Sequence, residues 1–156
     1  MITIRFVTCR DIVSAGIRGF EYGFWASHTE ALMPDGTLLG AHWQGGVLAR
    51  PHDYDKGTVE REEYVQLDAT PAQTDAFHAF LRSQLGKPYD TLAIAGIVAQ
   101  RDWQSPDSWF CSELQAAALC RPDVNVFPPH LATEVNHVTP RDLLLIVSGR
   151  MELPSP

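Results

Sequence analysis

The chain has 156 residues, of which 45% are hydrophobic and 20% charged, and its formal net charge is −7. This length suits one domain with its own core and is short for two. We therefore expect a single domain over residues 1–150, followed by a short tail over 151–156. The 12 Lys and Arg residues are scattered among 19 Asp and Glu residues. A nucleic-acid partner is not expected, because phosphate contacts need a basic face.

The cysteines and the N-terminus predict a cytoplasmic protein without a membrane span. Cys9, Cys111 and Cys120 form an odd set with no CxxC pair, which fits reduced thiols better than a disulfide framework. The opening segment MITIRFVTCRD has no charged lead before an apolar run, so it predicts a strand and not a signal peptide. The longest apolar run, at 91–99, is far short of the roughly 20 residues that a membrane span needs.

The first half of the chain predicts a sheet that contains one tight hairpin. Residues 2–8 alternate apolar and polar, as a half-buried strand does. Residues 11–23 have apolar residues at helical spacing but two internal glycines, so we expect a short helix or an irregular turn. A Pro-Asp-Gly segment at 34–36 lies between two strand-like runs and suits a type I turn closed by a glycine bulge. Residues 57–69 alternate again and predict a third strand.

The second half of the chain predicts helices. Residues 70–86 begin with a Thr-Pro cap and end on glycine, which is typical of a helix. A second helix is expected to begin near Cys111 and to end before Pro122. A second Thr-Pro start, at Thr139, predicts another helix, although the Leu-Leu-Leu-Ile-Val run that follows it also suits a strand. Together these elements predict one α+β domain.

The segment DSWFCSELQAAALC at 107–120 holds the candidate nucleophile. A thiol at a helix N-terminus has a lowered pKa, because unpaired backbone N–H groups and the helix dipole favour negative charge there. We expect Ser108 or Asp107 to cap the helix and Cys111 to lie in its first turn. Cys120 lies at the opposite end, where the dipole disfavours a thiolate. The alternative for Cys111 is a small buried hydrophobic residue.

His28 is the candidate base, since a cysteine nucleophile needs a group that takes its proton. It lies within the strand-like segment FWASHTEAL at the same parity as Ala26 and Leu32, so we expect it to face the core. A histidine buried there is costly unless another group pairs with it. His78 falls within the predicted helix 70–86, where we expect a surface or half-buried position.

The register of the hairpin decides which residue accompanies His28. A three-residue loop at 34–36 pairs His28 with His42, whereas a two-residue loop pairs His42 with Thr29 and turns it to the other face. The proline before Asp-Gly favours the three-residue loop. His42 could then orient the imidazole of His28, as the third member of a catalytic triad does. Glu30, at the same parity on the same strand, is the rival for this role.

A metal site is an alternative interpretation of the same side chains. It requires three or four convergent ligands, and His28, Glu30 and His42 would make a plausible set. No H-E-x-x-H motif supports it, however, and no G-x-S-x-G motif supports a serine hydrolase. We therefore expect neither a metal nor another cofactor.

These segments, in this order, resemble the circularly permuted branch of the NlpC-type papain-like superfamily, which includes YiiX-like proteins and lecithin retinol acyltransferase-like enzymes. In unpermuted members a PY segment precedes a DCSG helix start, and the histidine strands come afterwards. Here GKPYD at 86–90 precedes WFCSEL at 109–114, and SHTE at 27–30 comes before both. The resemblance covers roughly residues 24–120. It implies a permuted papain-like fold in which a central antiparallel sheet packs against helices and the nucleophile begins a helix.

The resemblance also assigns roles to individual residues. It implies that Cys111 is the nucleophile, His28 the base and His42 the third polar residue, and that Tyr89 lines the cleft. The family commonly has valine and glycine after the histidine, whereas Thr29 and Glu30 follow here. A glutamate at this position either narrows the cleft or supplies the triad acid.

The sequence thus predicts a cysteine hydrolase or acyltransferase that acts on an amide or ester bond. Tyr89, Trp103 and Trp109 suit either a lipid acyl chain or a peptide stem as substrate. Without an export signal or a cell-wall-binding repeat, we expect a phage-encoded or cytoplasmic enzyme that acts on a small amide, thioester or lipid acyl group. The alternative is a non-catalytic binding or phage-assembly module that retains the scaffold. A wide gap between Cys111 and His28, or a pocket plugged by tryptophan, would favour that alternative.

Overall fold

The structure is a computed structural model that describes residues 1–90, 107–127, 135 and 138–149. The predicted tail 151–156, the apolar run 91–99 and Trp103 lie outside the described residues. The described part is α+β, with a five-stranded antiparallel sheet and four helices. None of these helices is both long enough and apolar enough to cross a membrane.

The strands follow the order β4-β3-β2-β1-β5, and every neighbouring pair is antiparallel. Their bounds are β1 Ile2–Cys9, β2 His28–Leu32, β3 Leu38–His42, β4 Gly46–Arg50 and β5 Val59–Leu67. The alternating pattern predicted β1 and β5. It did not separate β4 from the second arm of the hairpin, which turns back after His42 and pairs with Gly46.

The hairpin between β2 and β3 has the three-residue loop that the proline favours. Ala31 pairs with Leu39 and Leu32 with Leu38, which is the predicted register. Gly36 has φ +81°, a conformation that glycine adopts without a steric penalty. Consequently, His28 at the start of β2 and His42 at the end of β3 lie at the same end of the hairpin.

The two faces of the sheet differ in chemistry. Ile4 and Phe6 of β1 pair with Ala31 and Thr29 of β2, and this face carries the apolar core. Arg5 pairs with Glu30, and Val7 with His28, on the opposite face. The prediction that His28 faces the core is therefore wrong. Its parity was extended from Ala26, which precedes the strand, and residues outside a strand do not keep its alternation.

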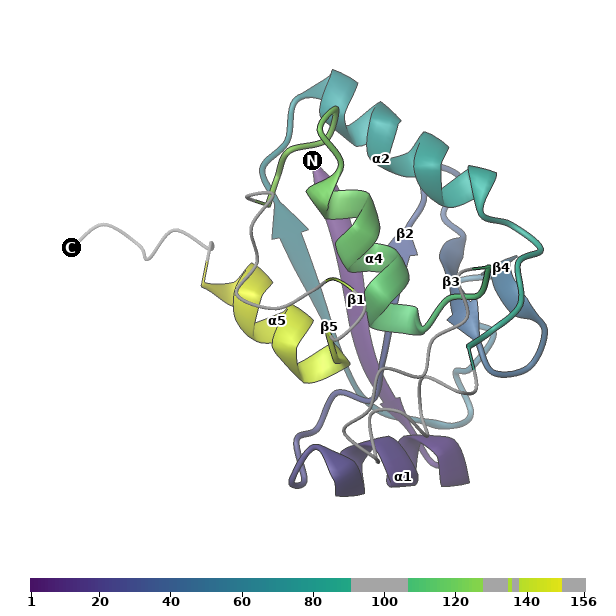
Figure 1. Ribbon diagram of the computed structural model, residues 1–156. Helices are drawn as coiled ribbons and strands as arrows, with labels where there is room; N and C mark the ends of the chain where they lie inside the picture. Colours follow the sequence, from purple (N-terminus) through teal and green to yellow (C-terminus); the bar gives the residue numbers. More distant parts are fainter. Residues whose placement is uncertain (91–106, 128–134, 136–137, 150–156) are drawn as a thin grey trace.

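Four helices surround the sheet (Figure 1), namely α1 Ile12–Phe20, α2 Pro71–Ser83, α4 Cys111–Cys120 and α5 Pro140–Ser148. Figure 1 shows α4 in front of the sheet, α2 above it and α1 below it. The predicted caps form at α2 and α5, so the run after Pro140 is a helix and not a strand. His78 is buried together with Phe77 and Leu81 on the inner side of α2, which corrects the expected surface or half-buried position.

Helix α4 begins differently from the prediction. Its N-cap is Phe110 and not Ser108 or Asp107. The carboxylate of Glu113 accepts a hydrogen bond of 3.1 Å from the backbone N–H of Phe110, so the acid at the third helical position satisfies the helix start. Cys111 is the first residue of the helix, within the first turn as expected.

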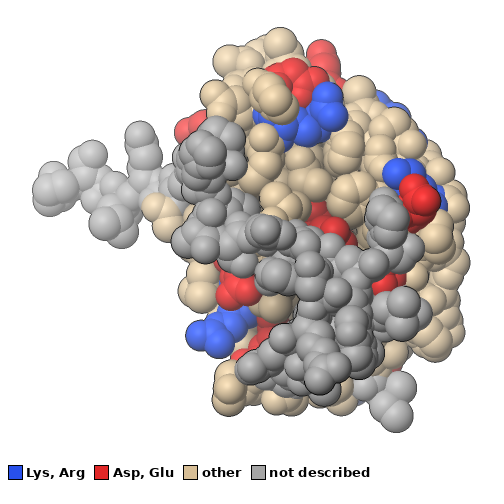
Figure 2. All heavy atoms as spheres, in the orientation of Figure 1, with Lys and Arg blue, Asp and Glu red and all other residues tan. Residues whose placement is uncertain are grey.

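Charged side chains are mixed on the face that Figure 2 shows. Among the described residues there, Lys and Arg lie beside Asp and Glu in small groups, without a continuous basic surface (Figure 2). The absence of a nucleic-acid partner stays a prediction.

Candidate active site

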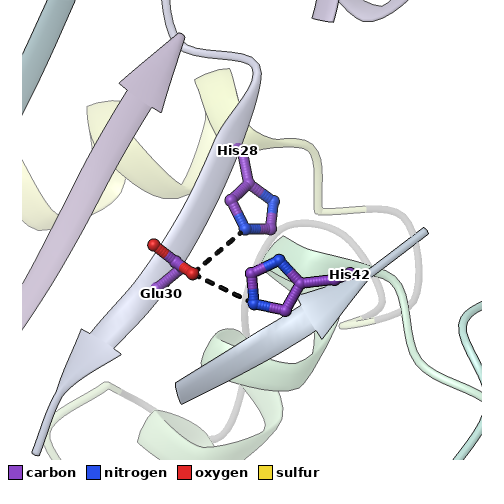
Figure 3. A group of neighbouring side chains, drawn as sticks. All are labelled: His28, Glu30 and His42. Carbon is purple, nitrogen blue, oxygen red and sulfur yellow. Dashed lines mark ion pairs between the residues drawn. The ribbon is translucent and has the colours of Figure 1, made fainter. Parts of the chain in front are cut away.

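The carboxylate of Glu30 contacts two histidines from neighbouring strands (Figure 3). Its Oε1 atom lies 3.0 Å from Nε2 of His42 and 3.6 Å from Nε2 of His28. The Glu30 side chain is fully buried, while those of His42 and His28 are 6% and 19% exposed. The two imidazole rings are 4.9 Å apart between centroids. Both candidates for orienting His28 thus lie in the same cluster, which we call the His–Glu–His cluster.

A glycine makes this arrangement possible. A Cβ atom placed on Gly40 of β3 would lie 3.0 Å from Cγ of Glu30 and 3.2 Å from the carbonyl oxygen of Thr29. Both contacts are closer than most side-chain contacts in folded proteins. The bare backbone at Gly40 therefore leaves the room that the Glu30 side chain fills between the two histidines.

Arg5, which the sequence did not indicate as a site residue, binds the second carboxylate oxygen of Glu30. The Arg5 guanidinium donates hydrogen bonds to Oε2 of Glu30 at 3.1 Å and to both oxygens of Asp55 at 2.9 and 3.1 Å. It also donates to the partly exposed Glu62 at 2.8 Å. Arg5 itself is buried. The half-buried strand predicted at 2–8 gives no sign that one of its charged residues is buried, and a buried arginine requires partners of this kind.

Tyr54 is a second missed contributor. Its hydroxyl donates a hydrogen bond of 3.0 Å to Oε1 of Glu30, and its ring meets that of His42 edge to face. The segment at 51–58 is polar and contains a proline and a glycine, which predicts a surface loop. Only the fold shows that this loop covers Arg5 and Glu30.

The electrostatics of the cluster keep Glu30 ionised and His42 neutral. Burial alone would raise the pKa of Glu30, but the neighbouring His28 and His42 hold this pKa well below its usual range. Burial lowers the pKa of His42 to about 4, more than its contact with Glu30 raises it. Burial and the adjacent Glu30 charge raise the pKa of Tyr54 well above its ordinary value, so its hydroxyl remains a donor.

His28 is the side chain that links the cluster to Cys111. Burial would lower the pKa of His28, but the charge and hydrogen bonding of the Cys111 sulfur, together with Glu30, raise this pKa to about 10. Nε2 of His28 is directed at Glu30 (Figure 3). His28 thus interacts with both the cysteine and the carboxylate.

A pocket of about 140 Å³ lies beside the cluster. Among the residues that line it are His28, His42, Trp43, Tyr54, Ile17 and Tyr89. Ile17 and Tyr89 also pack against the buried pair Phe110 and Cys111. Cys111 itself is fully buried and is not among the lining residues, so a substrate in this pocket reaches the sulfur only if the side chains around it move. Trp43 is 52% exposed, so it lies at the mouth of the pocket.

The predicted aromatic lining residues lie in different places. Tyr89 lines the pocket. Trp109 bridges to Tyr89 through the backbone, but its indole N–H donates to Gln84 at 3.1 Å and its ring packs on Phe80. Its ring is thus engaged by helix α2 and the residue after it. Trp103 lies outside the described residues.

Comparison with models of known protein families finds no family that matches this chain, and comparison with curated proteins finds no relative. The functional assignment must therefore come from the chemistry of the residues described above.

Proposed function

We propose that the protein is a papain-like thiol hydrolase or acyltransferase that acts on an amide or ester bond. The observation that carries the proposal is the position of His28, whose Nε2 lies 3.6 Å from the Glu30 carboxylate and whose pKa is raised by the neighbouring Cys111 sulfur. The order of the elements also supports a permuted papain-like scaffold. The hairpin with the histidines comes first in the chain, and the helix that begins with the cysteine comes later.

The chemistry follows from these positions. His28 accepts the thiol proton of Cys111, and the thiolate attacks the carbonyl carbon of the substrate. His28 then gives this proton to the departing amine or alcohol, which leaves an acyl group on the sulfur. Water or an acceptor hydroxyl group, deprotonated by His28, attacks that thioester and releases the product. The backbone N–H of Cys111, at the helix start, stabilises the oxyanion in both steps.

Glu30 is the residue that orients His28 in this scheme. Nε2 of His28 is directed at the Glu30 carboxylate, and His42 contacts the same carboxylate oxygen. His42 and Tyr54 therefore act on His28 through Glu30. We assign Glu30 as the third triad member and His42 as a positioning residue.

The full burial of Cys111 is the observation that favours the rival function, a non-catalytic binding module. Such a module has no need to expose its cysteine to a substrate. The two functions differ in one outcome: an enzyme forms a covalent acyl adduct on Cys111, whereas a binding module does not.

Turnover of the full chain on lipid esters and on short peptides that contain D-amino acids tests the proposal. Cys111→Ser should keep the fold, measured by circular dichroism, and lose turnover. Cys120→Ser removes a thiol from the other end of the same helix and should retain turnover. Undiminished turnover in Cys111→Ser would disprove the assignment.

A further inference from the structure

The His–Glu–His cluster has the composition and spacing of a metal site. One ring nitrogen of His28, one of His42 and a carboxylate oxygen of Glu30 all lie within 4.8 Å of one another. Two imidazoles and one carboxylate are a donor set that Zn²⁺ and related transition-metal ions prefer. We infer that these three side chains bind a divalent transition-metal ion, with Zn²⁺ as the best fit. This inference does not rest on the proposed function.

The spacing of the ligand atoms agrees with a bound ion. Zn²⁺ binds nitrogen and oxygen at about 2.0–2.2 Å, so two ligands of a tetrahedral ion are separated by about 3.3–3.6 Å. The distance from Oε1 of Glu30 to His28, 3.6 Å, lies at the upper end of this range, and the distance to His42, 3.0 Å, lies slightly below it. Small side-chain rotations would therefore bring all three atoms onto one ion.

The two histidine nitrogens also lack satisfied hydrogen bonds. Within the described part of the chain, Nε2 of His28 and Nε2 of His42 are buried and have no aligned hydrogen-bond partner, although each lies near Glu30. Buried polar atoms in folded proteins are usually paired. The His42 side chain is more than nine-tenths buried, and Figure 3 shows its ring nitrogen directed into the cluster. A metal ion would accept the lone pairs of both nitrogens at once.

The surroundings of Glu30 suit a metal ligand. Arg5 holds the distal oxygen, Oε2, and the Tyr54 hydroxyl donates to Oε1, so the carboxylate is fixed before an ion arrives. Such outer contacts commonly raise metal affinity by 10–100-fold. His28 and His42 both line the pocket. An ion could enter from there and keep a coordination position open to water or to a small ligand.

Metal binding and the proposed thiol chemistry use His28 differently. An ion bound to Nε2 of His28 and to Glu30 takes the place of the contact by which Glu30 orients the imidazole. We therefore expect Zn²⁺ to inhibit turnover reversibly, at the concentrations at which it binds. Cys111 is not one of the three ligands, so its removal should leave binding unchanged.

Calorimetric titration of the chelator-treated full chain with Zn²⁺ tests the site without a substrate. The expected result is one ion per chain, and titration with Co²⁺ should give the visible absorption of a site with nitrogen and oxygen ligands. His42→Ala should weaken Zn²⁺ binding by more than about 100-fold, since losing a ligand costs more than losing an outer partner. His52→Ala, which removes an exposed histidine that donates to or accepts from Tyr64, is the matched control and should bind as the wild type does.

Three results would overturn the inference: no Zn²⁺ binding by the wild-type chain, equal binding by His42→Ala, or loss of binding in Cys111→Ala. Circular dichroism checks that each variant is folded, and His28→Asn replaces His42→Ala if the latter is not. A chain that binds Zn²⁺ but has no thiol-dependent turnover would refute the proposed function alone. A chain with turnover but no Zn²⁺ binding would refute the metal site alone.

Discussion

Glu30 and Gly40 lie on neighbouring strands, and the Glu30 side chain occupies the space that a side chain at position 40 would fill. A Cβ atom at Gly40 would come within 3.0 Å of Cγ of Glu30. Gly40→Ala should therefore push the carboxylate away from the histidines, lower turnover and destabilise the fold by about 1–3 kcal/mol, the usual cost of overpacking. Urea unfolding measures the change in stability.

Gly57→Ala is the control for this substitution, because no atom lies within 4 Å of a Cβ at that glycine. It should be neutral, or stabilising by less than about 1 kcal/mol through the unfolded chain. Equal stability of the two variants would show that the space beside Glu30 is not needed.

Removal of the Glu30 charge should slow catalysis and change its pH dependence. Glu30→Gln keeps the shape of the side chain but loses the anion that helps to raise the pKa of His28 to about 10. We expect turnover to fall by up to about 10²–10⁴-fold, the usual contribution of general acid–base catalysis, because His28 loses the carboxylate that orients it. The limb of the pH profile that reports His28 should move to lower pH, because the imidazolium loses a stabilising charge. The kinetics are measured with chelator present, and an unshifted limb would contradict the orienting role.

The Arg5 network should make a large contribution to stability. Arg5→Met leaves Glu30 and Asp55 buried without their cation, so we expect a loss of about 3–5 kcal/mol in the free energy of unfolding. Arg10→Met, at an exposed arginine whose ion pair with Glu60 spans 3.4 Å, should change that free energy by less than about 1 kcal/mol. Chemical denaturation of both variants gives the comparison. A small effect at Arg5 would mean that the buried carboxylates find other partners.

The three cysteines should differ in reactivity. Burial raises the pKa of Cys9 to about 11 and also raises that of Cys120. Cys111 lies beside the His28 imidazole, so a small thiol reagent should modify it at lower pH than the other two. Tyr89→Ala should accelerate its modification, since Tyr89 packs against the buried pair Phe110 and Cys111 and also lines the pocket. Peptide mapping by mass spectrometry measures each site, and the same pH dependence at all three would contradict an activated thiol.

Local sequence signals predicted the helices with a cap residue at their start and the hairpin with a characteristic turn. The Thr-Pro caps located α2 and α5, and the Pro-Asp-Gly turn set the register that brings His28 and His42 to the same end of the hairpin. These signals act within a few residues of the chain, so a single sequence is enough to read them.

The environment of Glu30 was not predictable in the same way. Period-two alternation separates the two faces of a strand, but it does not show which face another segment covers. Arg5 and Glu30 are buried because Tyr54 and Asp55 reach them from a loop that follows two further strands. The same limit hid Arg5, the cation that supports Glu30, whereas the wrong face for His28 came from extending the parity of Ala26 into a strand that begins only at His28.

In the proposed mechanism His28 activates Cys111. Intact-mass spectrometry with thiol-reactive acyl probes tests this activation. Lipid-ester probes and D-amino-acid peptide probes are incubated with the wild-type chain, His28→Ala and Cys120→Ser. We expect one acyl group on Cys111 in the wild type and in Cys120→Ser, and none in His28→Ala. A wild-type chain that forms no acyl adduct with either probe class, or an adduct that forms equally well without His28, would contradict it.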